Sequence, residues 1–375
     1  MDITLHKNNK LFLETTYFRE YVPKDIMLKI LNSGKIKYSN YNSFSDDLWY
    51  SNLKYKNEKI NNPEHHFRIY FNNYDNLLVK YKKYHQNWGR VYPDLSVSIL
   101  KSYIRRTLLK DNYYDFDLSG TYPNILKNIC EKNNIDCPIL KKIIKQRDDI
   151  IEYFIKECKF PNDRDGRTYA KDLIFIHLYN GDDNDVEEIK KVYNINVIFP
   201  NILIDFKNEM DKIKKELINR NPELYDYCKK TFGNVKNNTF MTNKNTLGRG
   251  NLNGYFLSLY LQEQEVRIVN KILEWLYYNT NVMKKNGLNG YCIYEYDGFM
   301  LLRENVDREF GNCENLVQIL NDKMVEYGYD LNWEAKKLDE NIMNLNEDIY
   351  MDYKNLFIIC FSVILIYLIY IYKNE

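Results

Sequence analysis

The sequence predicts an α+β fold, in which helices pack on a small antiparallel sheet. The segment YYDFDLS, residues 113–119, alternates between side-chain types as a strand does. Far downstream, Asp297-Gly298 separates two apolar runs, and Asp-Gly in that setting is a strong signal for a β-hairpin. Between these two segments apolar residues recur mostly at helical spacing. Helices therefore dominate the region that separates the strand from the hairpin.

Helical patterns follow one another along most of the chain. They are expected over residues 22–34, 98–110, 121–135, 137–160, 166–181, 197–220 and 255–279. Pro123 falls in the first turn of the third segment, where proline is tolerated because its missing N–H has no helical partner there. The segment before residue 85 is mixed, and apart from its one helix it predicts no regular element.

Composition limits the kinds of protein that the chain can be. Its 375 residues suffice for a large core and for two or three structural units. The 53 Lys and Arg residues balance the 52 Asp and Glu residues, which excludes a uniformly cationic nucleic-acid binder but allows a local basic groove. The seven cysteines form no C-x-x-C pair, and the five histidines do not stand at zinc spacing relative to them. Reduced thiols in an intracellular protein are expected.

The C-terminal segment differs from the rest of the chain. Residues 356–372 carry no charge, and Lys354 and Lys373 flank them. This run has the minimum length that crosses a bilayer as a helix, so a membrane anchor is expected. A buried C-terminal strand or helix is the alternative. The N-terminus shows no basic and apolar signal peptide.

Two carboxylates stand close together on the predicted strand. Asp115 and Asp117 are two residues apart and so share one face. Adjacent carboxylates repel, so one protonates unless a cation lies between them or both stay solvated. Exposed strand ends often carry Asp, and the pair alone is weak evidence for a metal. Asp297 on the hairpin adds a third carboxylate, which favours a Mg²⁺ site where the two strands converge.

A stripe of basic and aromatic side chains follows on the helix of residues 166–181. Arg167, Lys171 and Phe175 are spaced four apart, and Tyr179 continues the same face. Such a stripe suits a triphosphate and a stacked base. A helix with one solvated basic end and one buried aromatic end gives the same pattern, and this segment alone favours that alternative.

The order of these segments resembles motifs A, B and C of the superfamily A nucleic-acid polymerases. Motif A corresponds to DLSGTYPNIL from Asp117, and motif C to YEYDGFML with Asp297. Motif B corresponds to Arg167, Lys171 and Tyr179 at the spacing R-x3-K-x7-Y. The resemblance covers residues 85–305. More specifically, the motifs resemble those of the divergent branch found in virophages, transposons and large DNA viruses.

The chain also departs from that pattern. Gly298 stands where most such enzymes have an acidic residue, and Tyr296 stands where they have histidine. Motif B ends in Tyr-Asn-Gly rather than Tyr-Gly. Glu295, two residues before Asp297, either supplies the missing carboxylate or faces solvent.

The resemblance implies roles for individual residues. Asp117 and Asp297 would hold two Mg²⁺ ions, with Mn²⁺ as a substitute, and Asp115 would support them. Tyr122 would lie under the sugar and exclude a ribose 2′-hydroxyl. The other implied nucleotide contacts are Arg167, Lys171, Phe175 and Tyr179, and the implied nucleic-acid contacts are Arg90, Arg105, Arg106 and Gln262.

The resemblance also implies an organisation and an activity. It divides the chain into an accessory or thumb-like region (1–84, partly helical), a palm in two parts (85–160 and 256–350), helical fingers (161–255) and the apolar tail (354–375). The expected enzyme is a nucleotidyltransferase, a DNA polymerase without a proofreading exonuclease. Its partners would be a DNA primer-template, deoxynucleoside triphosphates, a replicative helicase or primase, and a membrane at the tail. The alternatives are an RNA polymerase and a catalytically inactive, membrane-tethered replication protein that binds nucleic acid.

Overall fold

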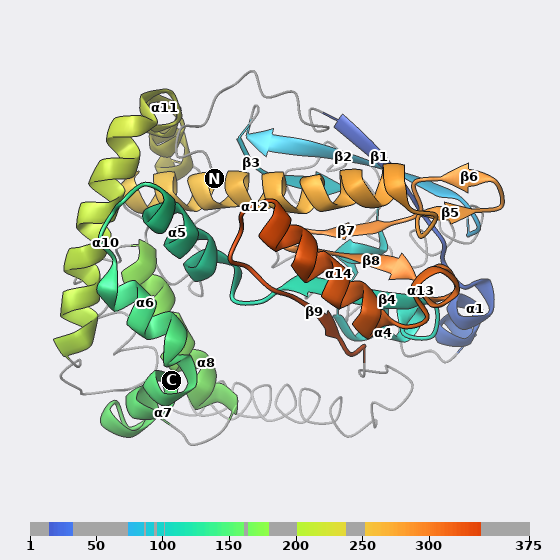
Figure 1. Cartoon of the computed structure of the whole chain (residues 1–375), viewed down its shortest axis with the longest axis horizontal. Coiled ribbons are helices and arrows are strands. Elements are labelled where there is room, and N and C mark those ends of the chain that lie inside the picture. The colour runs from blue at the N-terminus through green and yellow to red at the C-terminus, as the bar shows by residue number, and fades with distance from the viewer. Residues whose placement is uncertain are drawn as a thin grey trace, which may run out of the picture.

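The structure, a computed structural model, describes most of the chain in eight ranges. These are residues 15–32, 74–85, 88–93, 96–100, 102–160, 164–179, 201–237 and 252–338. They form helices and small antiparallel sheets, so the predicted α+β class is confirmed (Figure 1). The predicted anchor at residues 356–372 lies outside the described ranges. Within those ranges, no helix combines the length and the apolar character needed to cross a bilayer.

A four-stranded antiparallel sheet lies at the centre of the fold. Its strands are, in spatial order, β7 (Ile293–Glu295), β8 (Gly298–Leu302), β4 (Tyr113–Leu118) and β9 (Trp333–Lys336). On β4, Asp117 stands opposite Gly298 of β8 on one side and opposite Glu334 of β9 on the other. The predicted strand and hairpin are therefore neighbours in one sheet. The turn comprises Tyr296 and Asp297, and Gly298 already belongs to β8.

Side-chain alternation separates the two faces of this sheet. Phe116 of β4 and Trp333 of β9 both pack against Phe299 of β8, with ring centroids 5.8 and 5.0 Å away, so this face is apolar. Helix α14 (Cys313–Glu326) lies against β9, beside this aromatic row. Asp117 lies on the opposite face because successive side chains of a strand point to opposite sides. The sheet thus has a packed face and a face that carries carboxylates.

A second sheet lies where no strand was predicted. It is antiparallel, in the order β1 (Thr15–Glu20), β2 (Leu77–His85) and β3 (Trp88–Pro93), and the long helix α12 (Leu252–Asn279) packs along β3. The N-terminal region is partly helical as expected, since α1 spans Lys24–Asn32. Its two strands are an addition that the mixed Tyr- and Lys-rich sequence did not reveal.

Six further helices correspond to predicted segments: α4 (Ser102–Leu109), α5 (Thr121–Lys132), α6 (Pro138–Lys145), α7 (Arg147–Glu157), α8 (Arg164–Tyr179) and α10 (Asn201–Arg220). Helices α11 (Pro222–Asn237), α13 (Arg303–Phe310) and α14 were not predicted. The single helix expected over residues 137–160 is two helices, α6 and α7, which meet at Gln146. After this break, α7 and α8 lie together and apart from the three-stranded sheet (Figure 1).

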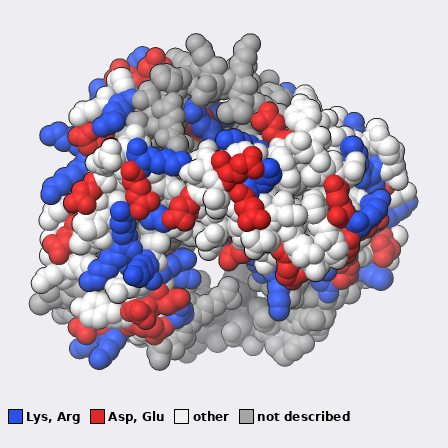
Figure 2. Space-filling view, in the orientation of Figure 1, with Lys and Arg blue, Asp and Glu red and all other residues white. Residues whose placement is uncertain are grey.

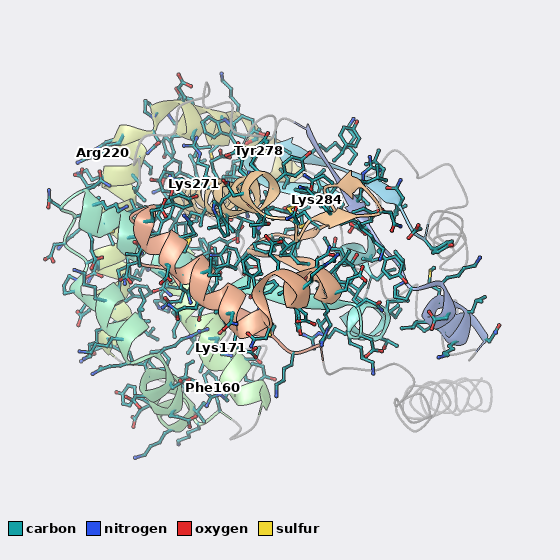
Figure 3. All side chains as sticks on the ribbon, turned by 45° about the vertical axis from the view of Figure 1, so that its right-hand side comes forward. Phe160, Lys171, Arg220, Lys271, Tyr278 and Lys284 are labelled. Carbon is teal, nitrogen blue, oxygen red and sulfur yellow. The ribbon has the colours of Figure 1, made fainter. Side chains whose placement is uncertain are left out.

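The two ends of the molecule have different surroundings. Phe160 and Lys171 lie together in the helical part, whereas Tyr278, in the last turn of α12, and Lys284, just after that helix, lie away from them (Figure 3). On the face seen in Figure 2, positive side chains gather over α6, and negative ones lie over the neighbouring α7. Charge is therefore local on this surface, as the balanced composition allows.

Candidate functional site

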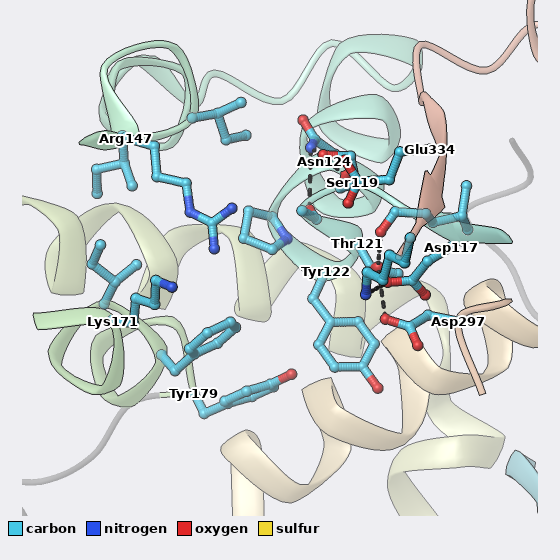
Figure 4. A pocket seen from close by; sticks show the side chains of 18 residues that line it. Asp117, Ser119, Thr121, Tyr122, Asn124, Arg147, Lys171, Tyr179, Asp297 and Glu334 are labelled. Carbon is cyan, nitrogen blue, oxygen red and sulfur yellow. Dashed lines mark hydrogen bonds and ion pairs between the residues drawn. The ribbon is translucent and has the colours of Figure 1, made fainter. Parts of the chain in front are cut away.

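A cavity of about 650 Å³ lies between the four-stranded sheet and helices α6, α7 and α8. Its lining comes from the end of β4, the start of α5, the β7–β8 turn and strand β9, which face the helices (Figure 4). Its volume falls within the range of small-molecule sites, roughly 300–1,000 Å³. Segments that are far apart in the sequence thus meet around one space.

Two carboxylates, Asp117 and Asp297, lie at the sheet side of this cavity. The Leu118 amide donates a hydrogen bond to the Asp297 carbonyl oxygen (3.1 Å), which joins the end of β4 to the turn. The Thr121 hydroxyl shares its proton between the Leu118 carbonyl oxygen (2.8 Å) and Asp297 Oδ2 (3.1 Å), so it links that carboxylate to the end of β4. Burial, and next the charge of Asp297, raise the pKa of the Asp117 carboxyl above its ordinary value. The structure therefore brings the two predicted carboxylates together, and their charges repel each other.

Gly298 permits this close approach of the strands. A Cβ atom at this position would lie 2.3 Å from the Phe116 carbonyl oxygen and 3.0 Å from Asp117 Oδ1. The first distance is shorter than real Cβ contacts, and the second is tighter than most of them. The glycine that departs from the resembled pattern is thus required by the packing of β8 against β4.

Strand β9 adds charged groups that the sequence did not indicate. Lys336 forms an ion pair with Asp117 Oδ2, and Glu334 lines the cavity beside them. Lys336 is half-exposed, while the Asp117 side chain is 11% exposed. The ammonium group therefore supplies part of the positive charge that the two carboxylates need.

Cations and aromatic rings line the opposite side. Lys171 of α8 and Arg147 of α7 point into the cavity, and Tyr122 and Tyr179 lie between them and the carboxylates (Figure 4). Phe175 also lines the cavity. Arg147 was not predicted, because its segment reads as the middle of a helix. The cavity thus has a cationic end, an aromatic wall and an acidic end.

Arg167 does not reach this cavity. Its guanidinium group forms ion pairs with Asp148, at 2.9 Å, and with Glu152, both on α7. The contact fastens α8 to α7, since both partners lie on the neighbouring helix. Arg147, and not the predicted Arg167, contributes a guanidinium group to the cavity lining.

Tyr122 is fixed by a buried group of polar side chains. Its hydroxyl donates to Glu265 Oε2 of α12 (3.4 Å), and its ring meets that of Tyr179 edge-on at 6.4 Å. Glu265 also accepts two hydrogen bonds from Arg90 of β3, at 2.7 and 2.9 Å. Arg90 lies 5.4 Å from the Tyr122 ring centroid. Arg90, a predicted nucleic-acid contact, therefore forms an internal ion pair that supports Tyr122.

Two further carboxylates lie outside the cavity lining. The Glu295 carboxylate is 3.0 Å from Arg105 Nε, an ionic contact in which the N–H is not aimed at the oxygen. Burial raises the pKa of Glu295 to about 7, although Arg105 opposes this. Burial also raises the pKa of Asp115, against the nearby Lys336 and Arg105. Neither carboxylate lines the space between Asp117 and Asp297.

The other predicted nucleic-acid contacts lie away from the cavity. Arg105 donates to the Ser98 carbonyl oxygen (2.8 Å) in addition to its contact with Glu295. Gln262 donates to the Ser258 hydroxyl (3.2 Å), and its other amide atom lies against Gly89 of β3. Arg106 influences Asp115 from the same helix, α4, as Arg105. These side chains support the two sheets and do not line the candidate site.

The donor set fits a hard divalent cation in part. Asp117 and Asp297 offer carboxylate oxygens side by side, and Mg²⁺ commonly takes one or two carboxylates and leaves positions for water and phosphate. In the described part of the chain, no cluster of three or more His, Cys, Asp and Glu side chains is placed to hold a metal. A cation here would therefore complete its coordination with water or with oxygen ligands from a substrate.

Comparison with known proteins gives one informative similarity. No family model matches the chain. A protein of Sputnik virophage, named "Putative helicase V13", is 25% identical over 296 residues, which cover 75% of this chain and 33% of that protein. The chain thus matches about a third of the length of this relative.

This similarity corrects the predicted activity. The predicted DNA polymerase is contradicted, because the similar virophage protein carries the name of a helicase. The RNA polymerase and the inactive replication protein, which were alternatives to it, are set aside with it. The placement of Asp117, Asp297, Lys171 and Tyr122 around one cavity does not depend on that activity.

Proposed function

We propose that this chain is a nucleotide-binding part of an enzyme that acts on nucleic acid in the manner of a helicase. It would bind a nucleoside triphosphate with a divalent cation in the cavity and cleave the triphosphate. The observation that carries the proposal is the meeting of Asp117 and Asp297 with Lys171 and Arg147 around one space. The helicase name of the virophage relative supports it, although that name describes a protein of which a third is matched.

The charges of the cavity suit a triphosphate. Lys171 and Arg147 would contact the terminal phosphates, because ammonium and guanidinium groups form strong charge-assisted hydrogen bonds with phosphate oxygens. A bound divalent cation would neutralise charge that develops on the transferred phosphoryl group. Asp117 and Asp297 would hold that cation, and Thr121 would keep Asp297 oriented. Each end of the cavity then has a separate task.

The aromatic wall suits the nucleoside. Phe175 and Tyr179 offer ring faces for stacking a base, which is worth about 1–3 kcal/mol per base. Tyr122 lies between them and the carboxylates, so it is placed beside the sugar of such a nucleotide. The buried Glu265 and Arg90 hold its ring. Sugar recognition by Tyr122 stays a prediction.

The triphosphate site would not be of the P-loop kind. The sequence contains no G-x-x-x-x-G-K-[ST] segment, which is the usual triphosphate loop of helicase motors. We therefore assign the nucleotide to the cavity at the sheet. The likeness of this sheet to a superfamily A palm stays a proposal about the fold and assigns no activity.

A route for nucleic acid lies beside the cavity. Helix α6 carries Lys141, Lys142 and Lys145 on its exposed surface, and the chain then enters α7 with Arg147. Positive side chains gather over this helix in Figure 2. Lysines in such a row contact the phosphate backbone without reading sequence. Nucleic acid along α6 would thus pass the mouth of the nucleotide site.

The test is release of inorganic phosphate by the full chain. Ribo- and deoxynucleoside triphosphates are supplied with Mg²⁺, with and without single-stranded DNA or RNA. We expect phosphate release that nucleic acid stimulates. Asp297→Asn should lower the rate about a hundredfold or more, in line with the loss of one charge-stabilising group.

Matched variants separate the site from general effects. Asp226→Asn removes an exposed aspartate from α11, and Lys215→Ala removes an exposed lysine from α10. Both should retain the wild-type rate, whereas Lys171→Ala should not. Equal rates in Asp297→Asn and wild type would overturn the proposal. Release of pyrophosphate in place of inorganic phosphate would contradict cleavage at the terminal phosphate.

A further inference from the structure

Lys336 occupies an unusual position beside the two carboxylates. In the register of β9 against β4, Lys336 stands opposite Asp115, and Glu334 stands opposite Asp117. The Lys336 side chain nevertheless reaches diagonally to Asp117 Oδ2 and pairs with it. It therefore lies on the carboxylate face of the sheet, at the edge of the cavity that Asp297 also lines.

The contact places a positive charge on an atom that a cation would use. Asp117 is one of two adjacent carboxylates, which repel each other unless a positive charge is near. The Lys336 ammonium offsets part of this charge, but only while it stays on the Asp117 oxygen. A divalent cation bound to the same oxygen would have to displace it. The two cations are thus competitors for one ligand atom.

The rest of β9 does not depend on this ion pair. Strand β9 is held by its backbone pairing with β4 and by the buried Trp333, whose ring packs against Phe299. Lys336 is half-exposed and carries a flexible stem, so its ammonium group can leave Asp117 for solvent or for a phosphate without a change in the strand. Release of the lysine is therefore a local event.

We propose that Lys336 is an internal counter-ion that competes with the divalent cation for Asp117 and sets the cation affinity of the site. This inference rests on the proposed nucleotide site and adds its regulation. The lysine keeps Asp117 neutralised when no substrate is present. A triphosphate adds oxygen ligands for the divalent cation and so favours exchange of the lysine for the metal. Cation and nucleotide then enter the site together.

The test measures binding of Mn²⁺ to the full chain without nucleotide. The electron paramagnetic resonance signal of free Mn²⁺ gives the unbound concentration. Lys336→Met keeps the length and apolar stem of the side chain but removes its charge. We expect this variant to bind Mn²⁺ about fivefold more tightly than wild type, the factor that corresponds to loss of one half-exposed ion pair. Lys337→Met, the control on the next residue of the chain, should bind as wild type does.

Two further variants keep the result decisive. Lys336→Arg retains the charge, so it should bind Mn²⁺ as wild type does, and this comparison holds even if Lys336→Met folds poorly. Tighter Mn²⁺ binding by Lys336→Arg would contradict the inference. Asp297→Asn should abolish binding. Equal affinity in wild type and Lys336→Met, with binding lost in Asp297→Asn, would overturn the role of Lys336 alone. No Mn²⁺ binding by any variant, with or without nucleotide, would overturn the proposed site as well.

Discussion

At the scale of single residues, Glu20 is the clearest case of a buried ionisable group. Its carboxyl group accepts hydrogen bonds from the Tyr81 hydroxyl (3.0 Å), the Ser96 hydroxyl (2.6 Å) and the Val97 amide (3.0 Å). It thereby ties β1 to β2 and to the short 3₁₀-helix at Val97–Ile99. Burial raises its pKa from 4.5 to about 7, because these hydrogen bonds do not fully replace water.

The free energy of unfolding should therefore fall as pH rises from about 4.5 to 7. The folded state holds the Glu20 proton more tightly than the unfolded state, so this contribution is complete below pH 4.5 and is lost above the folded pKa. The fall is at most about 3 kcal/mol for such a shift. Glu20→Gln stays neutral and should show a smaller fall between pH 5 and pH 8 in urea unfolding.

Glu223→Gln is the matched control for this measurement, because Glu223 is exposed on α11. Its unfolding free energy should follow the wild-type pH dependence. Glu295 also has a raised pKa and contributes to every one of these curves, so the difference between variants isolates Glu20. The same pH dependence in wild type and Glu20→Gln would show that Glu20 is not the titrating group.

At the scale of elements, the β7–β8 hairpin is the part that places Asp297. The turn at Tyr296 and Asp297 lies beside the end of β4 only because Gly298 leaves room for the Phe116 carbonyl oxygen. Gly298→Ala should destabilise the protein by roughly 1–3 kcal/mol or more, the range for a forced overlap in a packed core. It should also weaken Mn²⁺ binding, because Asp297 moves with the strand.

Gly287→Ala is the control for Gly298→Ala, because it introduces backbone strain without a steric overlap. Gly287 has a φ of +76°, but no atom lies within 4 Å of its would-be Cβ. This variant should lose about 1 kcal/mol of stability and should keep its Mn²⁺ affinity. Thermal unfolding with and without Mn²⁺ compares the two variants. Normal Mn²⁺ binding by Gly298→Ala would contradict the role given to the close approach of the strands.

The elements also show what sequence alone could predict. The strand that carries Asp117 and the turn that carries Asp297 were predictable, because a two-residue period and an Asp-Gly turn are local signals. That the two carboxylates lie side by side was implied by the resemblance and not by those signals. The four-residue strand β9 was not, since Trp333–Lys336 is too short to show a period, and its place beside β4 depends on packing. Lys336 was missed for that reason. Arg147 was missed because the break at Gln146 carries neither Gly nor Pro.

At the scale of the whole molecule, the candidate site exists only in the assembled fold. Its acidic end belongs to the central sheet and its cationic end to α7 and α8, which are joined by Arg167 and its two acidic partners. A triphosphate with its cation would connect these two parts.

The most direct test of the central claim is calorimetric binding of a nucleoside triphosphate to the full chain, with and without Mg²⁺. The wild type should require Mg²⁺ for tight binding. Asp297→Asn should bind the triphosphate weakly whether or not Mg²⁺ is present. Arg147→Ala and Lys171→Ala should each bind the triphosphate about tenfold more weakly than wild type, with a smaller loss of affinity for the monophosphate. Triphosphate binding that is independent of Mg²⁺ and unchanged in all three variants would contradict the account.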